Sequence, residues 1–212
     1  MKRLSIFVSG NGTNLQRIAE YFLEDWEVKI ENVVCNNPKA YAIERAKKLG
    51  IPVRMVTKEE FKSEAFIKEL QDLDIDLIVL AGFLWKLPEN LVKAFPKKIV
   101  NIHPALLPKY GGKGFYGEHV HEAVVAAKEA QSGITVHYVN ELYDSGEIIL
   151  QARVSLDENE TPNSLAAKIH TLEQAYFPVA IEQVLLSQMQ VEEKYIAENE
   201  SLYPLYNIFG LN

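Results

Sequence analysis

The chain alternates between short apolar runs and longer segments with helical periodicity. Five apolar runs predict strands, at 4–8, 28–35, 52–56, 75–81 and 99–103. Segments with apolar residues three or four positions apart lie between them and predict helices at 14–23, 40–48 and 58–72. Strands that alternate with helices in this way are typical of a sheet whose neighbouring strands run parallel.

The C-terminal third has a different pattern. Alternating positions at 132–140 and 147–154 predict two strands joined as a hairpin. A long helix is expected from Pro162 to about Ser187, followed by an irregular aromatic segment from Tyr195. We therefore predict an α/β protein with one domain: an open, mostly parallel twisted sheet with helices on both faces and a C-terminal antiparallel hairpin. That domain spans residues 1–195, and residues 196–212 form a tail packed on it.

Composition narrows the class of protein. Hydrophobic residues make up 48% of the 212 residues and charged residues 24%, as in ordinary soluble proteins. The net charge is −7 without a Lys/Arg-rich run, so a nucleic-acid partner is not expected. No apolar stretch reaches the ~18 residues of a membrane span, and the N-terminus is typical of a buried strand rather than a signal peptide. The single cysteine, Cys35, excludes an intrachain disulfide, and we expect a buried structural thiol in a cytoplasmic protein.

Two polar residues end the strand at 99–103. Asn101 and His103 are two positions apart, and such residues point to the same side of a strand. Pro104 cannot continue the hydrogen-bond ladder, so an amide and an imidazole are held at the carboxyl end of a strand, where α/β sheets bind ligands. The alternative is that Asn101 caps a turn and His103 is a buried structural histidine.

A glycine-rich turn, Ser-Gly-Asn-Gly-Thr at 9–13, leads from the first strand into the first helix. Backbone N–H groups and the helix dipole converge at Gly12, Thr13 and Asn14, which suits an anion. The turn is not a Walker motif, because no Gly-Lys-Ser/Thr ends it, and Leu15 breaks the pattern G-x-G-x-x-G. A tight turn with a Thr or Asn cap is the alternative.

Three other segments carry candidates. The apolar loop 83–87 either plugs the end of the sheet or forms the wall of a pocket. Four glycines in 109–117 indicate either a lid or a permissive surface loop. Asp144 lies in the hairpin turn, where aspartate is often only a turn residue. His119 and His121 lie on different faces of a helix expected at 118–130 and lack a third ligand, so no metal site is expected.

The segment Asn-Ile-His-Pro-Ala-Leu-Leu-Pro-Lys-Tyr at 101–110 resembles the signature of the folate-dependent formyltransferases. Three further segments, at 9–14, 81–87 and 136–151, resemble other motifs of that family in the same order. Relatives tend to carry Arg where this chain has Trp85, and their Leu-Asp-Gly-Gly turn is Tyr-Asp-Ser-Gly here. The resemblance covers about residues 3–195 and implies a Rossmann-like fold.

The resemblance also implies an activity: transfer of a formyl group from the co-substrate 10-formyltetrahydrofolate to the amine of glycinamide ribonucleotide, in purine synthesis, without a metal. The catalytic residues would be Asn101, His103 and Asp144, with His119 as a secondary candidate. The acceptor's phosphate and ribose would bind to Gly12, Thr13, Asn14 and Glu173. The folate would bind to Phe83, Leu84, Trp85, Lys86, Leu87 and Asn101. A carboxylate near an imidazole favours its charged form, so Asp144 is expected to raise the pKa of His103.

Other functions stay open. A methionyl-tRNA formyltransferase carries a further basic C-terminal domain and a formyltetrahydrofolate hydrolase a further N-terminal one, and we expect neither in this acidic chain of 212 residues. A folate- or nucleotide-binding module without catalysis is the non-enzyme alternative. The presence of Asn101, His103 and Asp144 together argues against it. We expect a monomer or a homodimer whose partners are small-molecule substrates.

Overall fold

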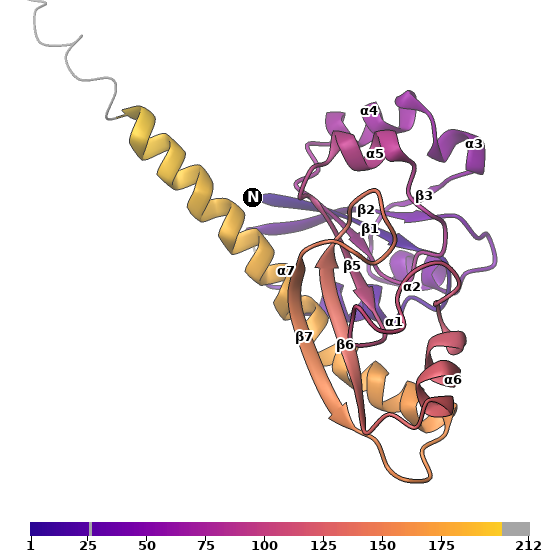
Figure 1. Ribbon diagram of the computed structural model, residues 1–212. Helices are drawn as coiled ribbons and strands as arrows, with labels where there is room; N and C mark the ends of the chain where they lie inside the picture. The colour runs from indigo at the N-terminus through magenta and orange to yellow at the C-terminus, as the bar shows by residue number, and fades with distance from the viewer. Residues whose placement is uncertain (26, 201–212) are drawn as a thin grey trace, which may run out of the picture.

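The computed structural model describes residues 1–25 and 27–200, with side chains up to Gln190. Within these residues seven strands form one sheet in the order β3-β2-β1-β4-β5-β6-β7 (Figure 1). The strands are β1 (Lys2–Val8), β2 (Val28–Cys35), β3 (Val53–Met55), β4 (Leu77–Leu80), β5 (Ile99–His103), β6 (Gln131–Tyr138) and β7 (Ile148–Ser155). The first five pair in parallel, whereas β6 pairs antiparallel with both β5 and β7. The predicted open, mostly parallel sheet with a C-terminal hairpin is confirmed.

Helices cover both faces of the sheet (Figure 1). They are α1 (Thr13–Tyr21), α2 (Ala42–Lys48), α3 (Lys58–Phe61), α4 (Glu64–Asp72), α5 (Glu89–Ala94), α6 (Glu118–Ala126) and α7 (Pro162–Glu200). Residues of α1, α2, α6 and α7 share one hydrophobic core with the sheet, and residues of α3, α4 and α5 share the other. Successive side chains of β1 point to opposite faces of the sheet, so Ile6 and Val8 belong to the first core and Phe7 to the second.

The segment 58–72 forms two helices, so the prediction of a single helix was wrong. Thr57 begins α3 with a capping box. Its side chain accepts from the backbone N–H of Glu60, and the Glu60 carboxylate accepts from the backbone N–H of Thr57. Ser63 begins α4, because its Oγ accepts from the N–H of Phe66 at 3.2 Å. Each serine or threonine supplies the acceptor that a helix start lacks, so the second cap divides the helix. The predicted apolar stripe is buried, at Phe61, Phe66, Ile67 and Leu70.

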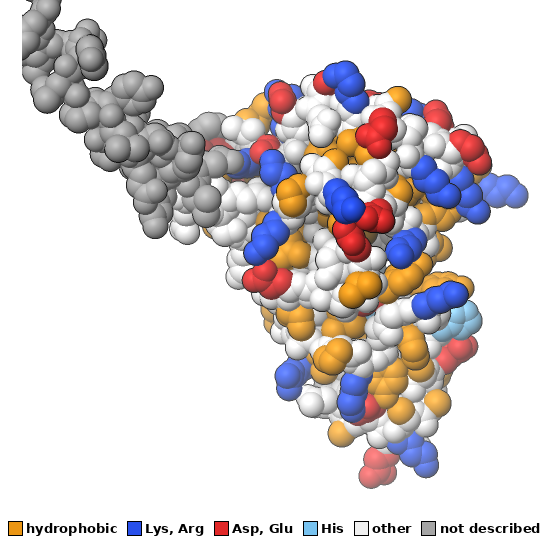
Figure 2. Space-filling view, turned by 45° about the horizontal axis from the view of Figure 1, so that its top comes forward, with side chains coloured by type: hydrophobic (Ala, Val, Ile, Leu, Met, Phe, Trp, Pro, Cys, Tyr) orange, Lys and Arg blue, Asp and Glu red, His pale blue; other side chains and the backbone are white. Residues whose placement is uncertain are grey.

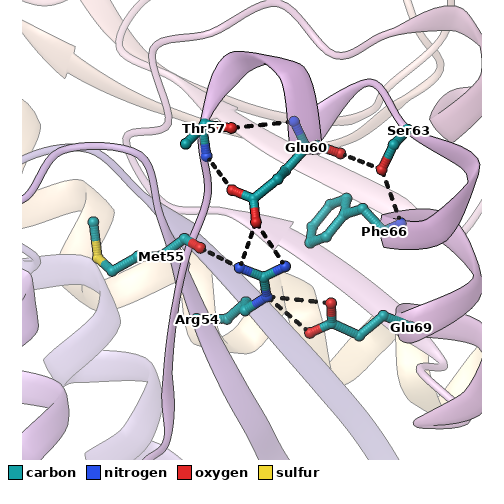
Figure 3. A network of polar contacts seen from close by, with 7 residues as sticks. All are labelled: Arg54, Met55, Thr57, Glu60, Ser63, Phe66 and Glu69. Carbon is teal, nitrogen blue, oxygen red and sulfur yellow. Dashed lines mark hydrogen bonds and ion pairs between the residues drawn. The ribbon is translucent and has the colours of Figure 1, made fainter.

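Arg54 joins the edge strand β3 to both of these helices (Figure 3). Its Nε donates to the two carboxylate oxygens of Glu69 on α4, at 3.0 and 3.2 Å. Its two terminal nitrogens reach Oε1 of Glu60 on α3, each at 3.4 Å. Since Glu60 also closes the capping box of α3, one guanidinium sets the position of both helices against the end of the sheet.

Helix α7 is longer than predicted. It continues to Glu200 instead of ending near Ser187, and its last turns extend past the sheet (Figure 1). No glycine or proline follows Pro178 before Glu200, so nothing in the sequence interrupts helix propagation. The predicted irregular segment is therefore helical as far as Glu200. The remaining tail, 201–212, and its expected packing lie outside the described residues.

Alternation along β5 decides which way its polar residues point. Val100 and Ile102 belong to the core shared with α7, whereas Ile99 belongs to the core shared with α3, α4 and α5. Asn101 and His103 therefore lie on the second side of the sheet, as the two-residue spacing predicts. None of the helices within residues 1–25 and 27–200 has the length and apolar character that a membrane-spanning segment requires.

Candidate active site

A cavity of about 570 Å³ lies where the loops after β1, β4, β5 and β6 meet. The loops after the first three of these strands follow carboxyl ends of parallel strands, the edge at which open α/β sheets bind ligands. All but one of the candidate residues line this cavity: Gly12, Thr13, Asn14, Phe83, Leu84, Trp85, Lys86, Leu87, Asn101, His103, Asp144 and Glu173. Residues 112–117 of the glycine-rich segment line it too.

His119 is the candidate that is not among the described residues lining the cavity. Its side chain is 62% exposed on α6, and its Nδ1 lies 3.3 Å from Oε2 of Glu122. The next histidine, His121, is buried on the other side of the helix. The described residues contain no group of three His, Cys, Asp or Glu side chains suited to a metal ion.

A polar cluster from β5, β6 and the hairpin loop forms part of the cavity wall. Asn101 and His137 are directly opposite in the β5–β6 register, and Nδ2 of the amide lies 3.2 Å from Nε2 of the imidazole. Asp144 lies between the two histidines. Its Oδ1 is 3.7 Å from Nε2 of His137, and its Oδ2 is 3.8 Å from Nδ1 of His103.

Backbone carbonyls determine the tautomer of each histidine. Nε2 of His103 lies 2.7 Å from the carbonyl oxygen of Tyr110, so that nitrogen carries the proton and Nδ1 faces Asp144. Nδ1 of His137 lies 2.9 Å from the carbonyl oxygen of Tyr138 and donates to it. Nε2 of His137 then accepts from Asn101, which leaves the second amide N–H and the Oδ1 of Asn101 for a ligand.

Burial lowers the pKa of His103, so the net shift is opposite to the one expected from Asp144 alone. Asp144 and the Tyr110 carbonyl act in the raising direction, but desolvation outweighs both. The His103 side chain is only 4% exposed, whereas 3.8 Å is too long for a hydrogen bond to Asp144. Burial likewise lowers the pKa of His137. Both imidazoles are therefore neutral at neutral pH in this state.

The start of the glycine-rich segment connects the two sides of the cluster. The N–H of Gly112 donates to Oδ2 of Asp144 at 2.9 Å, two residues after the carbonyl that binds His103. A Cβ on Gly111 would lie 2.5 Å from Cδ2 of Leu107 and 3.3 Å from Cβ of Asp144, so no larger residue fits without displacement. Asp144 itself has φ +47°, a conformation that aspartate tolerates better than most residues.

The turn after β1 and a carboxylate on α7 form the second part of the site. Gly12 precedes α1 with φ +77°, so the first N–H groups of the helix are presented at the cavity. Nδ2 of Asn14 donates to Oε2 of Glu173 at 3.1 Å. Burial raises the pKa of Glu173, and the bond from Asn14 partly opposes that shift. His170, one turn earlier on α7, places its Nδ1 3.6 Å from the same oxygen.

The apolar loop 83–87 is both plug and wall. Phe83 and Leu87 belong to the core beneath α3, α4 and α5, while the side chain of Leu84 is 64% exposed. Trp85 is partly buried, and its ring packs against Phe61 and Phe83 with centroid distances of 5.7 Å and 6.1 Å. Helix α3, which carries Phe61 and is bound by Arg54, therefore supports this wall of the cavity from behind.

Apolar side chains also surround the cavity at the surface. The exposed large hydrophobic residues among its lining are Leu84, Phe115, Tyr116, Leu142 and Tyr143. On the face shown in Figure 2, apolar side chains likewise reach the surface among charged ones. Lys86 places its ammonium 4.9 Å from the ring centroid of Tyr143 and so joins the apolar loop to the hairpin loop. Apolar walls with a few convergent polar groups are typical of a pocket for an organic ligand.

Sequence reasoning missed His137 and the two backbone groups at Tyr110 and Gly112. A signal for His137 existed, because position 137 alternates with buried apolar residues in the strand predicted at 132–140. Its contact with Asn101 depends on the strand register, which the sequence alone does not supply. The residue types at 110 and 112 gave no signal that their backbone groups would meet His103 and Asp144.

Comparison with known proteins gives consistent matches. The family model described as formyl transferase matches residues 2–181. The Bacillus subtilis (strain 168) phosphoribosylglycinamide formyltransferase is 36% identical over 191 residues, which cover 87% of this chain and 95% of that protein. The chloroplastic enzyme of that name from Arabidopsis thaliana is 41% identical over 176 residues, 79% of this chain, but this alignment spans only 60% of the plant protein. The crystal structure of glycinamide ribonucleotide transformylase 1 from Geobacillus kaustophilus has a TM-score of 0.79 at 34% identity, over 87% of this chain and 99% of that one.

Proposed function

Because the chain belongs to the formyl transferase family, we propose that it transfers the formyl group of 10-formyltetrahydrofolate to the amine of glycinamide ribonucleotide. The product is formylglycinamide ribonucleotide, an intermediate of purine synthesis. The cytoplasmic location and the monomeric or dimeric state inferred from the sequence stay predictions.

One observation carries the proposal. A single cavity is lined at once by a glycine-rich turn, an apolar wall and a cluster of hydrogen-bonding groups. The turn at Gly12, Thr13 and Asn14, with Glu173, suits a phosphate and the ribose hydroxyls. The loop 83–87 suits a flat pterin. A formyl donor and a phosphorylated amine can thus meet at the polar cluster.

The reaction begins when the acceptor amine attacks the formyl carbon and negative charge develops on the formyl oxygen. The free N–H of Asn101 is one donor for that oxygen, since its other N–H is held by His137. His103 is the second donor once it is protonated, because its Nε2–H is already bound by Tyr110. The developing oxyanion supplies the charge that offsets the desolvation of the imidazolium.

The tetrahedral adduct then collapses with cleavage of the bond between the formyl carbon and N10, and a proton moves from the attacking amine to N10 of the folate. Asp144 accepts the amine proton, directly or through a water, and it also faces Nδ1 of His103, the position of the second imidazole proton. The bond from Gly112 holds the Asp144 carboxylate toward the cluster. The chain needs no Ser or Cys nucleophile for this route, because the acceptor amine attacks directly.

The test mixes the purified protein with 10-formyl-5,8-dideazafolate and follows loss of the formyl group by absorbance. Loss only when glycinamide ribonucleotide is present supports the transferase. Equal loss without the ribonucleotide supports the hydrolase instead. Retained folate binding with no loss in either mixture supports a binding module.

A further inference from the structure

Hydrogen bonds to its backbone carbonyls fix the glycine-rich turn between β1 and α1. Three consecutive carbonyls, of residues 9 to 11, accept hydrogen bonds from Asn37, the N–H of Ala42 and Arg45, at 3.0, 3.1 and 3.0 Å. In a trans peptide the N–H points away from the carbonyl that precedes it. The N–H groups of residues 10 to 12 are therefore turned away from these donors, and the same residues line the cavity.

Arg45 makes the most extensive of these contacts. Its Nε binds the carbonyl of Asn11, its Nη2 binds Oδ1 of the same residue at 3.1 Å, and its Nη1 binds Oε1 of Gln16 on α1. The ring of Tyr41 covers the guanidinium at 5.0 Å from its centroid. One planar group thus fixes both the carbonyl of Asn11 and helix α1, which follows the turn.

Helix α2 approaches the turn closely enough to need a glycine there. A Cβ on Gly12 would lie 2.6 Å from Cβ of Ala42 and 3.5 Å from Cδ of Arg45. Gly12 also has φ +77°, which favours glycine for a second reason. The turn and the first part of α2 therefore form one packed unit.

The charge of Arg45 is not balanced by a carboxylate. Among the ion pairs of the described residues none includes Arg45, whose partners are a carbonyl and two side-chain amide oxygens. Arg45 is also not one of the described residues that line the cavity. A full positive charge thus lies directly behind N–H groups that point away from it, and it favours an anion in front of them.

We propose that Arg45 is a positioning residue for the phosphate of the acceptor. It holds the turn so that the backbone N–H groups receive the phosphate, and it adds a positive charge without touching the ligand. This inference rests on the proposed function, because it assigns the acceptor's phosphate to that turn.

The test compares Arg45→Met, Arg45→Lys and the control Arg153→Met, which removes an exposed arginine from β7 at the opposite edge of the sheet. We expect Arg45→Met to raise the KM for glycinamide ribonucleotide roughly 10- to 100-fold, the range for a lost hydrogen bond to a charged group. The kcat and the KM for the folate should stay within about twofold. Arg45→Lys should recover part of the loss because it keeps the charge, and Arg153→Met should match the unmodified protein.

A phosphate-free acceptor separates positioning from general damage. With glycinamide riboside, Arg45→Met and the unmodified protein should have equal kcat/KM. An equal loss with both acceptors, or no loss with the ribonucleotide, would overturn the inference. Calorimetric binding of the ribonucleotide without folate keeps the two hypotheses apart: tight binding without turnover contradicts only the proposed reaction, whereas equal affinity in Arg45→Met contradicts only the role of Arg45.

Discussion

His103 donates its Nε2 proton to the carbonyl of Tyr110 at 2.7 Å, and Tyr110 adopts φ +56°. The phenol of the same tyrosine donates to Oε1 of Glu129 at 2.8 Å, beyond the end of α6. Tyr110 thus joins the imidazole at the cavity to a carboxylate outside it. The direction in which His103 presents its second nitrogen depends on this connection.

Tyr110→Phe should lower kcat about fivefold with little change in either KM. The variant removes one hydrogen bond, worth roughly 1 kcal/mol, that fixes the carbonyl partner of His103. Lys109→Met is the matched control, because it removes the other partner of Glu129 and leaves the phenol bond in place. Steady-state kinetics on both variants provide the measurement. A kcat for Tyr110→Phe equal to that of the control would show that the phenol does not position His103.

Asn101→Ala should reduce turnover roughly 10²- to 10³-fold, the usual effect of removing an oxyanion donor. The amide is only partly buried and makes one side-chain hydrogen bond, to His137, so the fold should survive the change. The formyl-transfer assay measures the loss, and a thermal melt verifies folding. Near-normal turnover in a folded Asn101→Ala would exclude the proposed donor.

Gly133→Ala should destabilise the sheet by several kcal/mol or prevent folding. A Cβ there would lie 2.0 Å from the carbonyl oxygen of Ala152 and 2.7 Å from Cδ2 of Leu106, so backbone of β6 or β7 has to shift. Gly10→Ala is the control, because its Cβ would have nothing within 4 Å. Urea denaturation gives both free energies of unfolding. Equal stability of the two variants would contradict the tight β6–β7 contact.

Stability should decrease as the pH falls below about 6.5, in part because of His121. This side chain is 8% exposed, its Nδ1 has no hydrogen-bond partner among the described residues, and burial lowers its pKa. The unfolded chain takes up the proton near pH 6.5, whereas the folded chain does so only at lower pH. The stability is therefore fully present above pH 6.5 and is lost as the pH falls toward the folded pKa.

The free energy of unfolding between pH 7 and 5 measures this effect in the unmodified protein, His121→Gln and the exposed control His119→Gln. The slope of His121→Gln should be shallower by at most about 1.4 kcal/mol per pH unit, the value for one proton. His119→Gln should keep the original slope because that side chain is 62% exposed. Identical slopes in all three proteins would rule out His121 as a contributor.

Residue periodicity was sufficient for the strands and for the direction of Asn101 and His103. A strand's side chains alternate whatever lies next to them, so the spacing of Ile99, Asn101 and His103 determined a common side. The glycine-rich turn and the apolar loop 83–87 were also recognisable, because each depends only on residues that are adjacent in the chain. Periodicity did not reveal the break at Ser63, because a capping residue can also lie within a helix.

The tertiary structure alone decided the partners and the charge state of the site. His137 meets Asn101 through the β5–β6 register, and the carbonyl of Tyr110 meets His103 through a loop, so neither contact follows from residue types. The direction in which the pKa of His103 shifts depends on whether burial, which lowers it, outweighs the nearby Asp144 carboxylate, which raises it. Segments far apart in the chain set both the burial and the distance to Asp144. Local order follows from short-range sterics and hydrophobic spacing, which the sequence contains. The desolvation and the hydrogen-bond geometry of the site arise only when distant segments come together.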